Sequence, residues 1–501
     1  MYTNRSFFRI LLIYNMLQKS LKKNAIYSFI KAFMNLAFPL ISFPYASRVL
    51  LAEGIGKVNF ANSIIEYFVM IATLGIGTYA AREATRLRDD RSAHNKFCKE
   101  ILIINFISTA VAYLFLLIAF VFVSKFSEYR LLLIVCSTKI LFTTIGMDWL
   151  YNAHEEYKYI TIRSALFQLL SLVLLFTFVK TKDDYVAYAV MGVFSSVGSN
   201  VCNIIYSRRF FNFFEKAKIE LKKHLRPIFV FFGMTCASKF HTALDSVMLG
   251  FMLSDVAVGY YSAANKIRSL VQGLITAVLY TFMPRSSYYL EKNKIEEYNA
   301  LVSKTVNMSL FFSIPASVGI IVISHPLILL FSGEDFLGAL SSMIVMAPIV
   351  FIVSLSSAIT NVILTPNRLE RYTFYSEIVG FILNIILNAV FIPIWGVFGA
   401  AVATLIVEIA IALYRYVFCF SFLKKCNIIK NLIQIIFASA VMFICLWILL
   451  KVIDDILLQI IISVTAGAVV YAAVTLVLKN ESAYFLINEI LKKVNPNTRK
   501  I

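Results

Sequence analysis

Charged residues are scarce in this chain: Asp, Glu, Lys and Arg make up only 15% of its 501 residues. A soluble domain has about a quarter charged and about half apolar residues, whereas here 60% are hydrophobic and the mean hydropathy is +0.79. The apolar residues recur in runs of roughly 20, the length that a helix needs to cross about 30 Å of hydrocarbon. The shortage of charge therefore excludes a soluble domain and indicates an integral membrane protein.

Signatures of soluble catalysis are also missing. The seven Cys and five His are scattered without the close spacing of metal ligands, and no GxxxxGK phosphate loop occurs. We therefore predict no metal, no cofactor, no catalytic residue and no built-in ATPase, so that the chain is not an enzyme. Energy for transport then comes from an ion gradient, from the membrane potential or from the cargo's own concentration difference.

The apolar runs predict an all-α polytopic membrane protein with about fourteen transmembrane helices. If a short segment such as 371–392 is misread, the number is thirteen or twelve. The predicted helices lie near residues 24–47, 57–81, 97–123, 130–152, 158–180, 184–207, 227–253, 256–284, 298–331, 337–364, 371–392, 396–423, 429–450 and 455–478.

The distribution of basic residues tests this number. Lys and Arg exceed Asp and Glu by 47 to 28, a net charge of +19. With a cytoplasmic N-terminus, the inner loops carry 34 basic residues and the outer loops seven. The positive-inside rule requires this alternation, and a missed helix would scramble it. The basic excess is thus mainly a topology signal rather than a sign of nucleic-acid binding, and both termini are predicted to be cytoplasmic.

A shift of 203 residues aligns 56–82 with 259–285 without a gap. The shift spans six predicted helices, an even number, so the two copies cross the membrane in the same direction. Such parallel repeats predict two six-helix lobes about an axis along the membrane normal, with a cavity between them; chance similarity of apolar segments is the alternative. The seven identities join Gly56, Ala61, Asn62, Ile64, Thr73, Thr78 and Arg82 to Gly259, Ala264, Asn265, Ile267, Thr276, Thr281 and Arg285.

The repeat predicts the organisation of the chain. An amphipathic cytoplasmic lead-in (1–23) precedes the N-lobe (24–207), and a basic cytoplasmic linker (208–226) leads to the C-lobe (227–423). Two additional helices (429–478) and a cytoplasmic tail (479–501) follow.

Charges within the predicted helices are the candidate functional groups. Each costs about 2.5–3.5 kcal/mol at mid-bilayer and so faces a bundle interior or a wet cavity. The alternative for any one of these charges is an ion pair that holds two helices together. Asp245 and Arg268 are candidates for such a pair, because they lie at comparable depth on adjacent predicted helices. Because cations outnumber acids in the middle and outer parts of the predicted helix bundle, we predict a basic cavity for an anionic cargo. The predicted substrate-binding residues are Arg48, Lys139, Lys239, Lys266, Arg268 and Arg415, and the predicted ion-coupling residues are Glu66, His241, Asp245 and Glu408.

Several stretches resemble the Wzx-type polysaccharide flippases of the multidrug/oligosaccharidyl-lipid/polysaccharide superfamily. They are FPYASRVLLAEGIGKVNFANSIIEYFVMIATLGIGTYAARE (43–83), DWLYNAHEEYKYITIRSALFQLLSLVLLFTFVK (148–180), DSVMLGFMLSDVAVGYYSAANKI (245–267) and PIWGVFGAAVATLIVE (393–408). The resemblance extends over most of residues 24–425. It implies a fold of two six-helix lobes, often with two extra helices, in agreement with the repeat.

The resemblance implies a flippase that moves undecaprenyl-diphosphate-linked oligosaccharide units to the outer leaflet of the bacterial cytoplasmic membrane, for O-antigen, capsule or exopolysaccharide assembly. Its partners would be this substrate and membrane lipids, with a polysaccharide polymerase and chain-length proteins as candidates. The alternatives of the same fold are a flippase for the peptidoglycan precursor lipid II and a multidrug cation antiporter, whose cavity should be acidic. A membrane glycosyltransferase or polymerase would need a larger outer loop than this sequence has.

Overall fold

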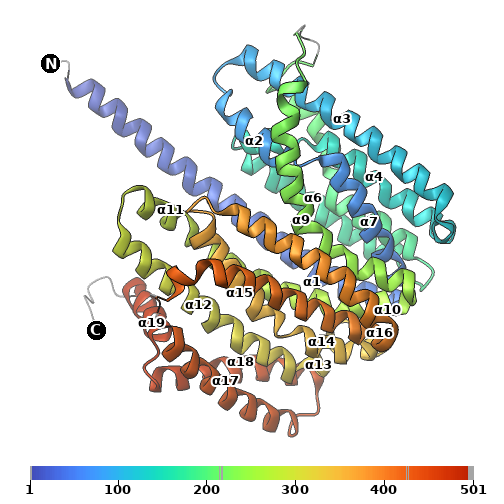
Figure 1. Cartoon of the computed structure of the whole chain (residues 1–501), viewed down its shortest axis with the longest axis vertical. Helices are drawn as coiled ribbons and strands as arrows, with labels where there is room; N and C mark the ends of the chain where they lie inside the picture. The colour runs from blue at the N-terminus through green and yellow to red at the C-terminus, as the bar shows by residue number, and fades with distance from the viewer. Residues whose placement is uncertain (1–2, 214, 216–217, 425, 427, 495–501) are drawn as a thin grey trace. The chain divides into compact units, whose positions relative to one another are not determined.

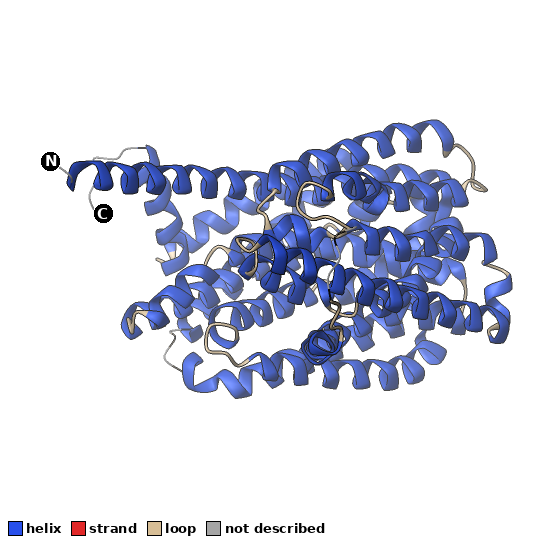
Figure 2. Cartoon of the chain, turned by 90° about the horizontal axis from the view of Figure 1, so that it is seen from above, coloured by secondary structure: helices blue, strands red, loops and turns tan. Residues whose placement is uncertain are grey.

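The computed structural model describes residues 3–213, 215, 218–424, 426 and 428–494, without the side chains of 3–22, 25, 234, 237–242, 489–490 and 492–494. The described residues form helices and loops and contain no strand, as Figure 2 shows. The predicted all-α class is therefore confirmed. The helices are α1 (Thr3–Thr73), α2 (Ile76–Arg86), α3 (Arg91–Phe122), α4 (Arg130–Gly146), α5 (Asp148–Ala153), α6 (Tyr157–Phe178), α7 (Tyr185–Val197), α8 (Val201–Ser207), α9 (Lys222–Met252), α10 (Asp255–Tyr280), α11 (Met283–Glu291), α12 (Ile295–Val322), α13 (Ser324–Phe331), α14 (Leu340–Met346), α15 (Ile349–Ile359), α16 (Glu370–Leu423), α17 (Ile428–Leu450), α18 (Ile456–Val477) and α19 (Glu481–Val494).

Polar residues in the loops start several of these helices. The side chains of Asp90, Ser254 and Asp455 each accept a hydrogen bond from a backbone N–H two or three residues further on. Such caps satisfy amide groups that the first turn leaves without partners. The helices α10 and α18 begin close to where the hydropathy pattern changes from polar to apolar, whereas α3 begins six residues before the apolar segment predicted at 97–123.

Ten described helices are long and apolar enough to cross a membrane, or eleven if the bent pair Glu334–Met346 and Ile349–Leu364 is one span. Two of the ten, Ile26–Arg86 and Glu370–Leu423, have 61 and 54 residues. At about 1.5 Å per residue, either is more than twice the thickness of the hydrocarbon core. Each leaves helical geometry near its middle, at Leu51 (φ 58°) and at Gly396 (φ 61°). With these two divided and α9 added, the helices correspond to the fourteen predicted segments.

The chain divides into two compact units, whose helices are labelled in Figure 1. Unit 1 comprises Met1–Leu50 and Ala61–Cys236, and unit 2 comprises Leu51–Phe60 and Ala237–Ile501. Each unit has its own buried clusters, between α2, α3 and α5 in unit 1 and around α12 in unit 2. The boundary in α9 lies beyond the linker predicted at 208–226, so the exact lobe limits stay a prediction.

The short segment Leu51–Phe60 packs within unit 2, against the first turns of α10. A Cβ built on Gly56 would overlap the carbonyl oxygen of Asp255, and one built on Gly259 would overlap that of Ala52. The backbone N–H of Ala52 also donates to Asp335 Oδ2 over 2.6 Å. Small residues permit such close approach of helices in membranes. The two glycines are therefore required by the crossing of these helices.

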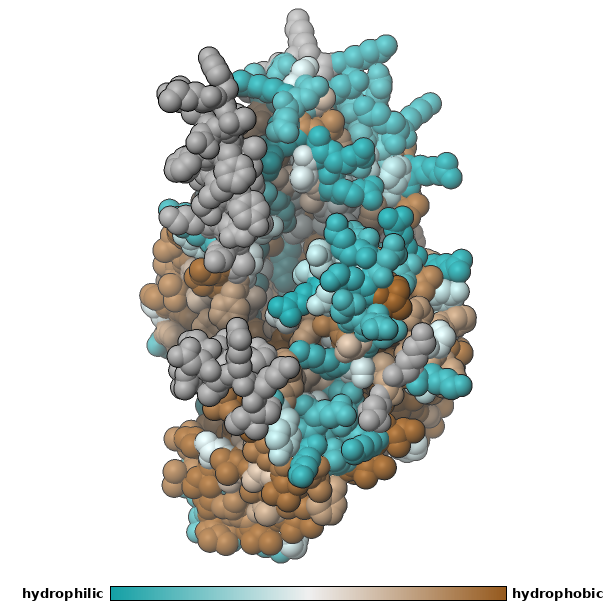
Figure 3. Space-filling view, turned by 90° about the vertical axis from the view of Figure 1, so that its left-hand side faces the viewer, coloured by the Kyte–Doolittle hydropathy of each residue, from teal (hydrophilic) through white to brown (hydrophobic). Residues whose placement is uncertain are grey.

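The C-terminal helices α17 and α18 complete unit 2. They pack on each other and on α12, around the buried residues Ile435, Ala438 and Met442. Their other side chains include many exposed large hydrophobics, such as Ile433 and Val469. In Figure 3 the lower end of the molecule, where Figure 1 draws α17 and α18, is mostly brown. Such an apolar outer surface is expected of lipid-facing helices.

Candidate functional site

A buried carboxylate in unit 2, that of Asp245, is surrounded by neutral polar groups. Its Oδ1 accepts hydrogen bonds from the amides of Asn384 (2.9 Å) and Asn388 (2.6 Å). Its Oδ2 accepts from the hydroxyls of Thr404 (3.0 Å) and Tyr261. Asp245 is 3% exposed, and both Asn are fully buried. Four donors hold the carboxylate, and none of them carries a charge.

Three helices bring this Asp245 cluster together. Asp245 lies on α9 and Tyr261 on α10, whereas α16 contributes the other three residues from both sides of its break. Asn384 and Asn388 are four residues apart and share one face of the first half of α16. The break at Gly396 adopts a positive φ, which glycine tolerates without strain. It brings the second half of α16 back along the first, so that Thr404 and the two amides bond the same carboxylate.

No described residue places a positive charge against Asp245. The guanidinium of Arg268 donates instead to Asn265 Oδ1, from Nε (3.1 Å) and Nη2 (2.8 Å), so the suggested pairing of Asp245 with Arg268 does not occur. The Oδ1 of Asn388 is buried without a donor among the described residues. Carboxylate, amide and hydroxyl oxygens suit a proton or a hard cation, and an unneutralised charge is costly at this depth. The Asp245 cluster is therefore a candidate site for one monovalent cation.

The guanidinium of Arg415, in contrast, is fully engaged within unit 2. Its Nε donates to Ser376 (2.9 Å), and its Nη1 donates to Ser356 (2.9 Å) and Thr360 (3.3 Å). Its Nη2 forms an ion pair with Glu377 over 2.5 Å. Arg415 is only 7% exposed. The network ties α15, the π-helical turn Thr360–Leu364 and both halves of α16 together.

Unit 1 holds two of the predicted substrate-binding cations. Lys139, on α4, is half-buried and donates from Nζ to Asn62 Oδ1 over 2.7 Å. Arg48 is exposed and donates from Nη1 to the carbonyl oxygen of Pro44 over 2.7 Å. The second bond lies within α1, one turn back along the helix. Lys139 is therefore oriented by a side chain of another helix segment, and Arg48 by its own backbone.

The remaining predicted residues have fewer described contacts. Lys266 is half-buried; its backbone carbonyl oxygen accepts from Ser269 Oγ over 2.9 Å, and its ammonium group has no hydrogen bond or ion pair with a described residue. Glu66 in unit 1 and Glu408 in unit 2 are also half-buried, and Glu408 lies one turn beyond Thr404 on α16. Lys239 and His241 lie on α9, but their side chains are outside the described residues.

Unit 1 contains a second buried carboxylate, that of Glu100 on α3. It accepts from His224 Nε2 (2.8 Å), Lys223 Nζ (3.0 Å) and the backbone N–H of Glu220 (2.8 Å). The Nδ1 of His224 bonds the hydroxyl of Tyr79 over 2.7 Å. Glu100 is fully buried. This Glu100 cluster fastens the end of the predicted linker to α3, and its charge is balanced locally.

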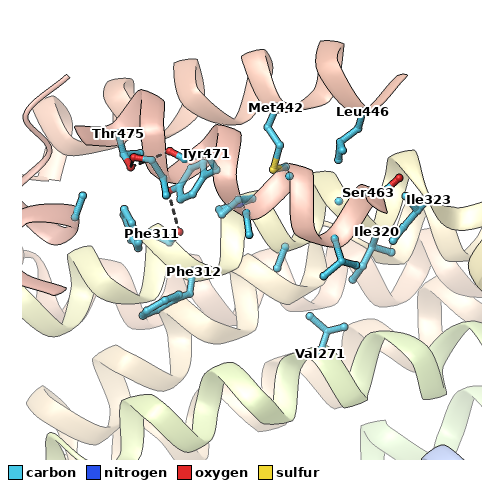
Figure 4. Close-up of a pocket in the computed structure, with 18 of the residues that line it drawn as sticks. Val271, Phe311, Phe312, Ile320, Ile323, Met442, Leu446, Ser463, Tyr471 and Thr475 are labelled. Carbon is cyan, nitrogen blue, oxygen red and sulfur yellow. Dashed lines mark hydrogen bonds between the residues drawn. The ribbon is translucent and has the colours of Figure 1, made fainter. Parts of the chain in front are cut away.

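An apolar cavity of about 630 Å³ lies in unit 2 and is lined by residues of α10, α12, α13, α17, α18 and α19. Figure 4 shows Phe311, Phe312, Met442 and Tyr471 around it. The hydroxyl of Tyr471 donates to the carbonyl oxygen of Phe311 over 2.8 Å. Because most lining side chains are apolar and the hydroxyls of Tyr471 and Thr475 bond carbonyl oxygens, the wall suits a hydrocarbon rather than a sugar or a phosphate.

Sequence reasoning missed the neutral members of the Asp245 cluster and the whole Glu100 cluster. The candidates were chosen as ionisable residues within apolar segments, so that neutral amide side chains were left out. A signal was present, since Asn384 and Asn388 lie one helical turn apart within an apolar run. Buried amides in a membrane helix are costly enough to require partners.

Two family profiles match the chain. The family described as "Polysaccharide biosynthesis protein" matches residues 21–290, more than half of the chain. The family described as "MatE" matches residues 231–390. The two matches overlap over residues 231–290, which include Asp245 on α9 and Arg268 on α10.

Curated relatives match most of the chain. The "Putative O-antigen transporter" of Escherichia coli (strain K12) is 24% identical over 395 residues, which is 78% of this chain and 94% of that protein. The solved structure "Lipid II flippase MurJ, inward closed conformation" has a TM-score of 0.72 at 19% identity, covering 91% of this chain and 98% of that one. An inward-facing multidrug resistance MATE family transporter has a TM-score of 0.57 at 13% identity, with coverages of 79% and 100%. At these identities the two structures show the fold alone.

Proposed function

Because the chain belongs to the polysaccharide biosynthesis protein family, as the resemblance indicated, we propose that it is a flippase for lipid-linked oligosaccharides. It moves undecaprenyl-diphosphate-linked repeat units from the inner to the outer leaflet of the bacterial cytoplasmic membrane by alternating access. The units serve O-antigen, capsule or exopolysaccharide assembly. The observation that carries the proposal is the family match over more than half of the chain.

The charges of the described residues support an anionic head group as cargo. A diphosphate cannot enter hydrocarbon unpaired, since isolated buried charge costs far more than its hydrogen bonds recover. Lys139, Lys266 and Arg268 are half-buried cations, and none of them pairs with a described acid. We assign them to the diphosphate, together with Arg48 and Lys239. Arg415 contributes least, because its three guanidinium nitrogens already bond groups of unit 2.

The Asp245 cluster supports coupling to a cation. Among the described residues, only neutral donors hold Asp245, so that one proton or one Na⁺ sets its charge in this proposal. Glu66, His241 and Glu408 are the other candidates for coupling. Outward movement of two negative charges with a negative interior gains about 4–5 kcal/mol per 100 mV. Cation uptake at Asp245 then serves to reset the carrier rather than to drive the cargo.

The substrate leaves this protein chemically unchanged, since we propose no catalytic role for it. The apolar cavity of unit 2 offers space for part of the polyprenyl chain. Both termini are cytoplasmic in this proposal, and a polymerase and chain-length proteins receive the cargo at the outer leaflet.

The test uses proteoliposomes with a fluorescent undecaprenyl-diphosphate oligosaccharide and a quencher outside. We expect accessible label to rise faster than in empty liposomes, and faster still with a negative interior. Labelled lipid II and a cationic dye are run in parallel. Faster movement of lipid II would replace the proposed cargo by the peptidoglycan precursor, and transport of the dye alone would make the protein a multidrug antiporter.

A further inference from the structure

Two asparagines that the internal repeat relates each hold one of the substrate-binding cations. Asn62 and Asn265 are 203 residues apart, the shift that aligns 56–82 with 259–285. In unit 1, Asn62 Oδ1 accepts from Lys139 Nζ over 2.7 Å. In unit 2, Asn265 Oδ1 accepts from Arg268 Nε (3.1 Å) and Nη2 (2.8 Å). The same repeat position thus has the same type of contact in both units.

The cations themselves do not follow the repeat. Lys139 comes from α4, whereas Arg268 comes from α10, three residues beyond its asparagine. A shift of 203 residues places Ser342 opposite Lys139 and Ile65 opposite Arg268. Two cations of different origin therefore meet equivalent amides. The repeated feature is the neutral acceptor, which indicates a requirement for it in both copies.

The contacts leave donors of both cations for a ligand. Asn62 takes one of the three N–H groups of Lys139, and the other two have no described partner. Asn265 occupies the side of the guanidinium formed by Nε and Nη2. The end formed by Nη1 and Nη2 keeps one N–H on each nitrogen, and a guanidinium binds phosphate bidentately through such a pair.

The neutrality of the acceptor matters as much as its position. A carboxylate at either place would hold the cation as firmly but would cancel its charge. An amide oxygen restricts the side chain and leaves the charge available to an anion. We infer that Asn62 and Asn265 are positioning residues that orient Lys139 and Arg268 toward the diphosphate of the cargo without neutralising them. The inference rests on the proposed function for the identity of the anion.

Aspartate substitutions separate this role from a merely structural one, because Asp keeps the shape and the acceptor. We expect Asn62→Asp and Asn265→Asp each to raise the half-saturating concentration for flipping of the labelled oligosaccharide lipid about tenfold, the loss of about one charge-assisted contact. The maximum rate should change less. Asn62→Ala and Asn265→Ala, which add no charge, should raise the half-saturating concentration about threefold. In a Lys139→Ala background, Asn62→Asp should have little further effect, because the two act through one contact.

Asn35→Asp is the matched control, since Asn35 Oδ1 accepts from the neutral amide of Gln168 over 2.9 Å; its half-saturating concentration should equal that of the parent protein. Binding of undecaprenyl diphosphate to the detergent-solubilised protein is the second readout. If this binding weakens in the Asp variants while no oligosaccharide is flipped, the proposed function fails and the inference stands. If the Asp variants bind and transport like the parent protein, while Lys139→Ala and Arg268→Ala do not, the inference is overturned and the function stands. If the parent protein binds no undecaprenyl diphosphate, both are overturned.

Discussion

The two units hold their buried carboxylates in different ways. In unit 1, Glu100 meets Lys223 and His224 at the end of the predicted linker. In unit 2, Asp245 meets two amides and two hydroxyls inside an apolar helix bundle. Both carboxylates are almost completely buried, at 0% and 3% exposure. The difference lies in the charge of the surrounding groups.

The charge of the surrounding groups separates a structural role of a buried carboxylate from a role in cation binding. A carboxylate with cations beside it is balanced in one state, and removing it leaves those cations uncompensated. A carboxylate among neutral donors is balanced only when a proton or a metal cation joins it. We therefore expect the Glu100 cluster to support stability and the Asp245 cluster to support transport.

The largest effect is expected at Glu100. Glu100→Ala leaves His224 buried without its acceptor and removes the acceptor of Lys223 and of the backbone of Glu220, at a cost of about 3 kcal/mol. The free energy of unfolding in detergent measures this. Glu220→Ala is the control, because Glu220 is half-exposed and its ion pairs with Lys96 and Lys223 contribute less than about 1 kcal/mol. Equal losses in the two variants would contradict the comparison.

Arg415 tests whether a charge-paired group in unit 2 supports stability in the same way as Glu100 does in unit 1. Arg415→Met leaves Glu377 without its guanidinium and is expected to cost about 2–3 kcal/mol of unfolding free energy. The double variant Arg415→Met with Glu377→Gln should recover more than half of this loss, since no unpaired charge is left. Unfolding curves of the two single variants and the double variant give the coupling. A double variant as unstable as the sum of the singles would show that the pair is not coupled.

Asp245→Asn is expected to act on transport instead. Asn has nearly the same shape, and its amide can still bond the surrounding amides and hydroxyls, so the free energy of unfolding should change by less than about 1 kcal/mol. The turnover rate in energised proteoliposomes should fall about tenfold, because no cation can be taken up. Asn361→Ala, a buried amide elsewhere in unit 2, serves as control for general effects on transport. An unstable Asp245→Asn variant with normal turnover would reverse the assignment.

The smallest effect is expected from His154, between α5 and α6 of unit 1. Burial, followed by the nearby His94, lowers its pKa from 6.5 to about 4, and the two ring nitrogens lie 3.2 Å apart. Between about pH 6.5 and pH 4, His154 is protonated in the unfolded chain but remains neutral in the folded protein. The free energy of unfolding therefore falls as the pH decreases from about 6.5 to 4. Because the ring is only half-buried, the loss is well below the roughly 3 kcal/mol of a fully buried group. Unfolding at pH 7 and pH 5 measures it, and His154→Gln should flatten the dependence.

Hydropathy predicted the segments well, because a membrane requires every spanning helix to be long and apolar. The sequence did not predict which of these segments continue into one another as a single helix. The segment 24–47 and most of 57–81 lie in the single helix α1, which is interrupted at Leu51, and 371–392 and 396–423 both lie in α16, which is interrupted at Gly396. The lead-in predicted at 1–23 runs on as helix into the first segment from Thr3.

Partners of buried charges were the harder part. Depth along two helices suggested Asp245 and Arg268 as a pair, but rotation about each helix axis decides which side chains meet. Arg268 turns to Asn265 on its own helix, and Asp245 turns to α16, more than 130 residues away in sequence. Contacts between segments so far apart leave no periodic trace in a single sequence.

The crossing of Leu51–Phe60 over α10 has one more property. Gly56 approaches Asp255, and Gly259 approaches Ala52; adding 203 to 52 and 56 gives 255 and 259, so each contact is the other with the repeat copies exchanged. Identical subunits exchange contacts in this way at an isologous interface. The crossing is thus a self-complementary joint inside one chain, and a side chain added at either glycine would meet the same obstacle, a carbonyl oxygen four residues before the other glycine.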